Sequence, residues 1–409
     1  MKATGKLYSP EKRGDPHARA AEASSSAETD LCGFLLMVTI LVVFGLTMLY
    51  SASYGVSGLK YFRNQLMWVA LGGLSGGAAF LIGYRRLAAW SLPAVVVCMI
   101  LMLIARFCFS DINGAYRWIR LGPMSLQPSE FAKIALALYT AKYCCDNMRT
   151  FSHFRGRRGL LPLGVVVMLT AGFIVLGHDL GTMVLVCAMV FLTLVAAGLY
   201  LRYVVVPLIG AGLVAVYVYF FDAMRLARVT SFLHPESVQA GQGYQLWTSL
   251  IALGSGGWFG VGFMESRMKA KYLPEAHTDF ILAIVGEELG FVGMVGLLLV
   301  FGLFAWFALR IAARAGSRLG MLTAFALTMG IVLQGVINLA VISGSAPTKG
   351  MPMPFISYGG SNLLATLIAV GVIASVAADT VMPGYDERIA EAVRRRWNEW
   401  RRRRGNEDT

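Results

Sequence analysis

The chain has 409 residues, of which 57% are hydrophobic and 14% charged, and its formal net charge is +13. So apolar a composition excludes an ordinary soluble domain and indicates a protein whose solvent is the lipid bilayer. The six cysteines show no metal-ligand spacing and mostly fall in or beside apolar stretches. We interpret them as packing residues, and neither as disulfides nor as zinc ligands.

Apolar stretches of membrane-spanning length recur along the whole chain. A transmembrane helix needs about 20 predominantly apolar residues. This criterion predicts an all-α polytopic membrane protein with about ten transmembrane helices. The predicted spans are 31–51, 66–83, 87–107, 129–144, 160–177, 180–198, 203–221, 280–309, 319–343 and 361–380.

Basic residues predict the orientation of these spans. Lys and Arg are concentrated in the segments that share a side with residues 1–30, and the positive-inside rule places that side in the cytoplasm. We expect a polar cytoplasmic tail at 1–30 with no removable signal peptide, a membrane domain at 31–380 and a basic cytoplasmic tail at 381–409. A large extracytoplasmic loop at 222–279 separates spans seven and eight. Topology accounts for the net charge, so no nucleic-acid partner is expected.

Polar residues at the outer ends of the spans are the candidates for a functional site. Glu130 and Lys133 are three residues apart on the fourth span, which predicts either an internal ion pair or part of a polar cavity. Arg117, just before this span, suits an anionic head group or an interfacial anchor. Further basic residues make the large outer loop electropositive, which suits a phosphate-bearing ligand, although solvated loop charges are the alternative. They are Arg225, Arg228, Arg267, Lys269 and Lys271.

Two more outer segments have distinctive sequences. The stretch SLIALGSGGWFG predicts a short amphipathic element at the outer membrane surface, in a loop that roofs a cavity. The last outer loop reads SGSAPTKGMPMPFISYGGSN, in which proline and glycine exclude a regular helix. It holds Lys349 on a stiff path toward the outer face, unless the loop is only a structural turn.

Charged residues crowd the start of the eighth span in the stretch KYLPEAHTDFILAIVGEELG. Thr278 or Asp279 is predicted as the helix N-cap, because either precedes the apolar run directly. Glu287 and Glu288 lie about two turns deeper and indicate a polar seam in the protein interior.

Four stretches of this ten-span chain resemble the SEDS family of shape, elongation, division and sporulation proteins. They are YLPEAHTDFILAIVGEELG, APTKGMPMPFISYGGSNLL, RWIRLGPMSLQPSEFAK and GYQLWTSLIALGSGGWFGVG. Ala276, Gly286 and PTKGMPMPF resemble the division members more than the elongation members. Relatives commonly have proline where His178 stands in GHDLGT, and the segment Phe263–Ser266 also departs from the family pattern.

The resemblance implies a peptidoglycan glycosyltransferase that polymerises lipid II at the bacterial cytoplasmic (inner) membrane, at the division septum, and releases undecaprenyl pyrophosphate. Asp279 of the HTD motif would be catalytic, and a hydroxyl-activating base suits that chemistry. A divalent cation (Mg²⁺ or Mn²⁺) shared by Glu130 and Asp279 is a further candidate, and no organic cofactor is expected. The expected substrate-binding residues are Arg117, Glu130, Lys133, Lys269, Glu275, His277, Lys349 and Ser357.

The resemblance also implies a class B penicillin-binding protein as transpeptidase partner, together with other division proteins. The C-terminal tail carries arginines from Arg394 to Arg404 around Trp397 and Trp400, which predicts binding to anionic lipid or a simple positive-inside anchor. Two alternative functions stay open. One is a lipid II flippase whose polar path is lined by the intramembrane charges, and the other is a division scaffold in which Asp279 is dispensable.

Overall fold

A computed structural model describes most of the membrane domain. The described residues are 16–110, 116–122, 124–147, 159–200, 203, 210, 243–270, 272–385, 387–389, 391 and 395. Nearly all of the predicted seventh span, the first part of the large outer loop with Arg225 and Arg228, the single residue Lys271 and most of the basic tail lie outside them.

The described part of the chain is mostly helical with almost no strand, which confirms the all-α membrane class. Six helices are long and apolar enough to cross a bilayer, and α6 and α7 are shorter apolar helices. The two strands form one antiparallel hairpin just before α5, with Arg120 opposite Ser125. The elements are α1 (Pro16–Ser57), α2 (Lys60–Ile82), α3 (Tyr84–Ala89), α4 (Ser91–Cys108), β1 (Ile119–Leu121), β2 (Met124–Leu126), α5 (Pro128–Asp146), α6 (Leu160–Leu176), α7 (Leu180–Ala196), α10 (Tyr244–Ser255), α11 (Ile281–Arg314), α12 (Arg318–Ile342) and α13 (Gly360–Val381).

Most predicted spans coincide with a helix to within a few residues, and the differences are local. Helix α1 begins at Pro16, so the second half of the segment predicted as a polar tail is helical. Helix α2 begins six residues before the predicted span, at Lys60. The third predicted span contains a break at Trp90, which separates α3 from α4. Of the predicted short amphipathic element at 249–260, residues 249–255 belong to helix α10, and the remaining five residues lie beyond the end of the helix.

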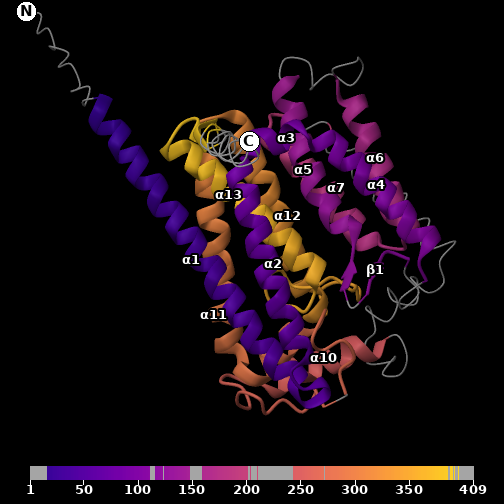
Figure 1. Cartoon of the computed structure of the whole chain (residues 1–409). Helices are drawn as coiled ribbons and strands as arrows, with labels where there is room; N and C mark the ends of the chain where they lie inside the picture. The colour runs from indigo at the N-terminus through magenta and orange to yellow at the C-terminus, as the bar shows by residue number, and fades with distance from the viewer. Residues whose placement is uncertain are drawn as a thin grey trace, which may run out of the picture.

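The two ends of the bundle differ in what they carry. Helix α1 begins and α13 ends at the same end, at the top of Figure 1, while α10 and the hairpin lie toward the opposite end. Helix α2 packs along α13, α1 along α11, and α12 contacts both α5 and α7. The loops before α11 and α13 therefore meet the hairpin segment at one end of the bundle, where most of the predicted site residues lie.

The interface between α2 and α13 depends on small residues. A Cβ on Gly76 would lie 2.5 Å from the carbonyl oxygen of Leu367, and one on Gly371 would lie 2.0 Å from the carbonyl oxygen of Gly76. Neither position accepts a side chain without moving a helix. Such close contact between backbones is the usual means by which helices associate within a membrane.

Helix α11 is interrupted at Gly290, whose φ of 68° and ψ of −167° are not helical. The segment that follows α10 docks on this break through its backbone. The amides of Val261 and Gly262 donate to the carbonyls of Glu287 and Glu288, at 3.0 and 3.1 Å. In return, the amides of residues 291 and 292 donate to the carbonyls of residues 257 and 258. The irregular backbone around Gly290 thus finds its hydrogen-bond partners within the protein. It needs them there because lipid offers none.

Candidate functional site

Asp279 lies in the turn that leads into α11 and does not cap the helix. The first helical residue is Ile281, and Phe280 precedes it as an N-cap with no side-chain hydrogen bond. The Thr278 hydroxyl donates to the Glu275 carboxylate at 2.8 Å instead. The N-cap prediction was therefore wrong for both Thr278 and Asp279, because the helix starts later than the apolar run suggested. The carboxylate of Asp279 is not engaged in capping and is available for chemistry.

The carboxylate of Asp279 lies against the last outer loop. A Cβ on Gly350 would be 2.8 Å from Asp279 Oδ2 and 3.8 Å from Arg117 Nη2, so carboxylate, glycine and guanidinium meet at one point. Burial raises the pKa of Asp279 to about 7. The Arg117 guanidinium opposes this rise, and the carboxylates of Glu275 and Asp179 add to it. A carboxylate with such a pKa is a stronger base than an ordinary aspartate and is still half ionised near neutral pH.

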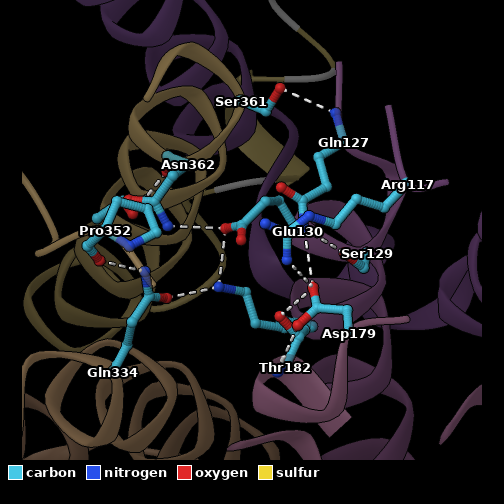
Figure 2. A network of polar contacts seen from close by, with 12 residues as sticks. Arg117, Gln127, Ser129, Glu130, Asp179, Thr182, Gln334, Pro352, Ser361 and Asn362 are labelled. Carbon is cyan, nitrogen blue, oxygen red and sulfur yellow. Dashed lines mark hydrogen bonds and ion pairs between the residues drawn. The ribbon is translucent and has the colours of Figure 1, made fainter. Parts of the chain in front are cut away.

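Asp179 holds Arg117 in this place (Figure 2). Asp179 Oδ2 lies 3.3 Å from Arg117 Nη1 and accepts a hydrogen bond of 3.0 Å from Gln127 Nε2. Asp179 also caps α7, because its side chain accepts from the backbone amide and the hydroxyl of Thr182 at 3.1 and 2.8 Å. These hydrogen bonds hold the Asp179 carboxylate in one position. Its ion pair with Arg117 therefore keeps the guanidinium beside Asp279.

The turn before Asp179 differs from one that contains proline. His178 has a φ of 62°, a value that the proline ring forbids. Its backbone amide donates to the carbonyl of Val175 at 2.8 Å, and its ring meets the ring of Tyr116 edge-on at 6.0 Å. The departure at His178 thus changes the local backbone, while Asp179 still caps the helix.

Lys349 crosses the first turn of α7. A Cβ on Gly181 would lie 2.8 Å from Lys349 Cε and 2.9 Å from Cδ, so the aliphatic stem runs directly over the glycine. The next residue, Gly350, lies against Asp279 and near Arg117. The loop therefore brings the Lys349 ammonium to the same region as the Arg117 guanidinium. The absence of a side chain at Gly181 is a condition for that path.

Replacing Gly181 with valine is expected to displace Lys349 and to lower the rate of the reaction proposed below by about 10-fold or more, since misplacing a site group by 1 Å costs up to about 100-fold. Gly172→Val on α6 is the matched control, because a Cβ there meets nothing within 4 Å. The rates of the two purified variants are compared at equal thermal stability. Equal rates would contradict a role for the Lys349 path.

Glu130 and Lys133 form the predicted ion pair within α5. Lys133 Nζ lies 2.8 Å from Glu130 Oε2 and donates to Gln334 Oε1 at 2.6 Å. Asn362 Nδ2 donates to the same Glu130 oxygen at 2.8 Å, and Gln334 Nε2 donates to the carbonyl of Pro352 at 2.8 Å. Figure 2 shows that this network joins α5 to α12, α13 and the last outer loop. The pair therefore lies directly behind the loop that faces Asp279.

Lys269 belongs to a different cluster. It lies 2.7 Å from Glu288 Oε1 and 3.1 Å from the Ser51 hydroxyl, so its charge is neutralised within the protein. The neighbouring Glu287 accepts hydrogen bonds from the Ser266 hydroxyl and from the backbone amide of Arg267 at 2.9 Å. Both glutamates are buried, which confirms the predicted polar seam. The cluster ties the segment after α10 to α1 and α11, and it makes Lys269 a poor candidate for neutralising the charge of a departing pyrophosphate.

The other predicted binding residues surround the turn that carries Asp279. The ring of His277 lies 4.4 Å from that of Tyr61 and 5.9 Å from that of Tyr358, and burial lowers its pKa. Glu275 is exposed. Ser357 is buried, and its hydroxyl accepts a hydrogen bond of 2.8 Å from the backbone amide of Met353. That bond gives Ser357 a role in shaping the loop.

This end of the bundle thus brings the Asp279 carboxylate together with Arg117 and the Lys349 loop. Comparison with known proteins places the chain in a family. The family of cell cycle proteins that unites FtsW, RodA and SpoVE matches residues 31–381. The chain belongs to this family. It is the SEDS family that the sequence motifs resemble, and the match extends from residue 31 within α1 to the end of α13.

Individual relatives of the FtsW/RodA/SpoVE family match over nearly their whole length. A probable peptidoglycan glycosyltransferase FtsW of Trichlorobacter lovleyi is 38% identical over 364 residues, which is 86% of this chain and 94% of that protein. The stage V sporulation protein E of Bacillus subtilis is 36% identical over 356 residues, which is 84% of this chain and 95% of that protein. A solved structure described as structural coordination of polymerization and crosslinking by a peptidoglycan synthase complex superimposes with a TM-score of 0.72, at 28% identity, over 86% of this chain and 98% of that one.

The family fold places several unpredicted residues in the site. Asp179, Gln334, Asn338 and Asn362 each bind a predicted site residue or its backbone, although reasoning from the sequence did not select any of them as site residues. Asp179 stood in a motif, GHDLGT, where an acidic residue precedes an apolar helix, so its capping role was recognisable. The three amides gave no such signal.

The acidic residues near Asp279 do not fit a bound divalent cation. Glu130 is occupied by Lys133 and Asn362, and Asp179 by Arg117, Gln127 and Thr182. Among the residues that the structure describes, no three His, Cys, Asp or Glu side chains gather as metal ligands. Because Glu130 is not available to share a cation with Asp279, no step proposed below passes through a metal.

Proposed function

We propose that this chain is a peptidoglycan glycosyltransferase that polymerises lipid II into glycan strands and releases undecaprenyl pyrophosphate. The observation that carries the proposal is the Asp279 carboxylate, whose pKa is raised to about 7 and which lies beside Arg117 and the Lys349 loop. The FtsW relative named as a probable peptidoglycan glycosyltransferase supports the same reaction.

The proposed reaction needs one base and a means of stabilising the leaving group. Asp279 accepts the proton from the hydroxyl of the acceptor sugar as that oxygen attacks the anomeric carbon of the donor. The bond from this carbon to the pyrophosphate breaks, and attack from the opposite face converts an α-linked donor into a β-linked product. Arg117 and Lys349 neutralise the negative charge that develops on the departing pyrophosphate, so no acid is needed to protonate it.

The proposed location follows from the distribution of charge and of the site. With the start of α1 in the cytoplasm, as the positive-inside rule predicts, Asp279 lies at the extracytoplasmic end of the bundle. The protein then acts on the outer leaflet of the bacterial cytoplasmic membrane, at the division septum. A class B penicillin-binding protein is the proposed partner that crosslinks the strands, in keeping with a structural neighbour that couples polymerization to crosslinking.

The flippase alternative receives less support. Its proposed polar path uses Glu130, Lys133, Glu287 and Glu288, and each of these groups is already bound to another protein group. They are buried in two separate clusters that hold helices and loops together. Because these charged groups are already paired within the protein, they are poorly placed to bind a polar head group and carry it across the membrane.

The rate of polymerisation is expected to rise with pH through about 7 and then to level off. Asp279 must be ionised to accept a proton, and its raised pKa means that the base is lost as the pH falls through that value. The measurement is the initial rate of glycan formation from labelled lipid II between pH 5.5 and 8.5, by the purified protein with a transglycosylase-free crosslinking partner. A rate that falls as the pH rises through 7 would contradict the assignment, and absence of polymer at every pH would overturn the proposed function.

A further inference from the structure

Asn338 on α12 connects the two loops that form the site. Its side chain is buried, and Nδ2 donates to the backbone carbonyl of Asp279 at 2.8 Å and to that of Met351 at 2.6 Å. One of these loops carries Asp279 into α11, and the other carries Lys349 and Gly350. A single nitrogen from a third element therefore sets the distance between them.

The chemistry of the residue suits this task. A carboxamide nitrogen bears two hydrogens, one for each carbonyl, whereas a hydroxyl has only one and an ionised carboxylate has none. Gln334 lies one turn earlier on the same face of α12 and donates to the carbonyl of Pro352. Two amides on one rigid helix thus hold the last outer loop at neighbouring residues, and Asn338 alone of the two also holds Asp279.

We propose that Asn338 is a positioning residue, which holds the Asp279 carboxylate against Gly350 and Arg117 by fixing the backbone of both loops. The inference rests on the proposed function only in its kinetic consequence. Its structural part is that the Asn338 side chain determines the surroundings of the Asp279 carboxylate without touching that carboxylate. The charged groups that act on the carboxylate are Arg117, Glu275 and Asp179.

The primary test replaces Asn338 with alanine and reads the environment of Asp279 without catalysis. Carbodiimide labels protonated carboxyl groups, so mass spectrometry of labelled Asp279 across a pH series gives its midpoint of titration. Wild type is expected to titrate near 7, and Asn338→Ala at a lower pH, because the loosened loop admits water to the carboxylate. Thr328→Val, which removes a buried hydroxyl that donates to the Ala324 carbonyl one turn back on α12, is the matched control and is expected to keep the wild-type midpoint.

The kinetic test uses the same variants with labelled lipid II. For Asn338→Ala we expect kcat to fall by about 10- to 100-fold with a smaller change in KM, since misplacing a group by 1 Å costs up to about 100-fold. Asn338→Asp keeps the side-chain volume and serves if the alanine variant does not fold. When ionised it has no donor for the carbonyls, so its rate is expected to fall as well.

The outcomes separate the two proposals. An unshifted midpoint of Asp279 in folded Asn338→Ala, or a loss of rate that only follows the folded fraction, would overturn the positioning role. A shifted midpoint in a protein whose wild type makes no polymer would support the positioning role and overturn the proposed function. A shifted midpoint together with reduced kcat would support both.

Discussion

Replacing Asp279 with asparagine is expected to reduce glycan polymerisation by roughly 10² to 10⁴, the usual contribution of a general base. The amide is nearly the same size as the carboxylate, so the contact with Gly350 persists, but it cannot accept the proton of the attacking hydroxyl. The measurement is polymer formation from labelled lipid II by the purified variant with its crosslinking partner. Equal expression and equal thermal stability to wild type are required for the comparison.

The control for Asp279→Asn is the same chemical change at Glu265, an exposed carboxylate of the outer segment. Glu265→Gln is expected to keep the wild-type rate. If Asp279→Asn also kept it, the base would have to be another group, and Glu275 would be the first to replace. Growth of a depletion strain rescued fully by Asp279→Asn would favour a scaffold role over catalysis.

Breaking the Glu130–Lys133 pair is expected to destabilise the protein by about 3–5 kcal/mol, because the partner left behind is a buried charge with no opposite charge beside it. Lys133→Met removes the ammonium and leaves Glu130, which is 4% exposed, with Asn362 as its neighbour. Thermal unfolding in detergent micelles measures the loss. The double variant Glu130→Leu with Lys133→Met is expected to recover much of it, since no buried charge remains.

Lys142 and Asp146 provide the reference for this prediction. They form an ion pair of 2.9 Å on the same helix, but the two side chains are 36% and 59% exposed. Lys142→Met is expected to change stability by less than about 1 kcal/mol. If Lys133→Met proved equally mild, or if the double variant were as unstable as the sum of the single ones, the pair would not be coupled as described.

Local patterns in the sequence predicted the features that depend on neighbouring residues, namely the helices and the ion pair within one helix. Apolar stretches gave the helices, because backbone groups in lipid must be bonded within their own segment. The spacing of Glu130 and Lys133 predicted their ion pair. Glu287 and Glu288 were placed in a polar seam because a charged group is costly against lipid, although their partners Ser266 and Lys269 were not identified.

The sequence could not predict contacts between segments that are distant in the chain. Arg117 and Asp179 meet because the hairpin segment folds onto the start of α7, and no spacing rule connects them. The N-cap prediction failed for a related reason. The backbone at Asp279 is held by Asn338 from another helix, and this tertiary bond outweighs the local preference for a capping aspartate.

The break in α11 also bears on how the chain enters the membrane. In an unbroken helix, the amides of residues 291 and 292 would bond to the carbonyls of Glu287 and Glu288, four residues back. Those are the same groups that now bond to residues 257–262. The chain can therefore enter the membrane with α11 as a continuous helix, in which the backbone groups around Gly290 are paired with one another. Docking of the preceding segment then exchanges hydrogen-bond partners around Gly290, so that no bare backbone needs to face lipid during biogenesis.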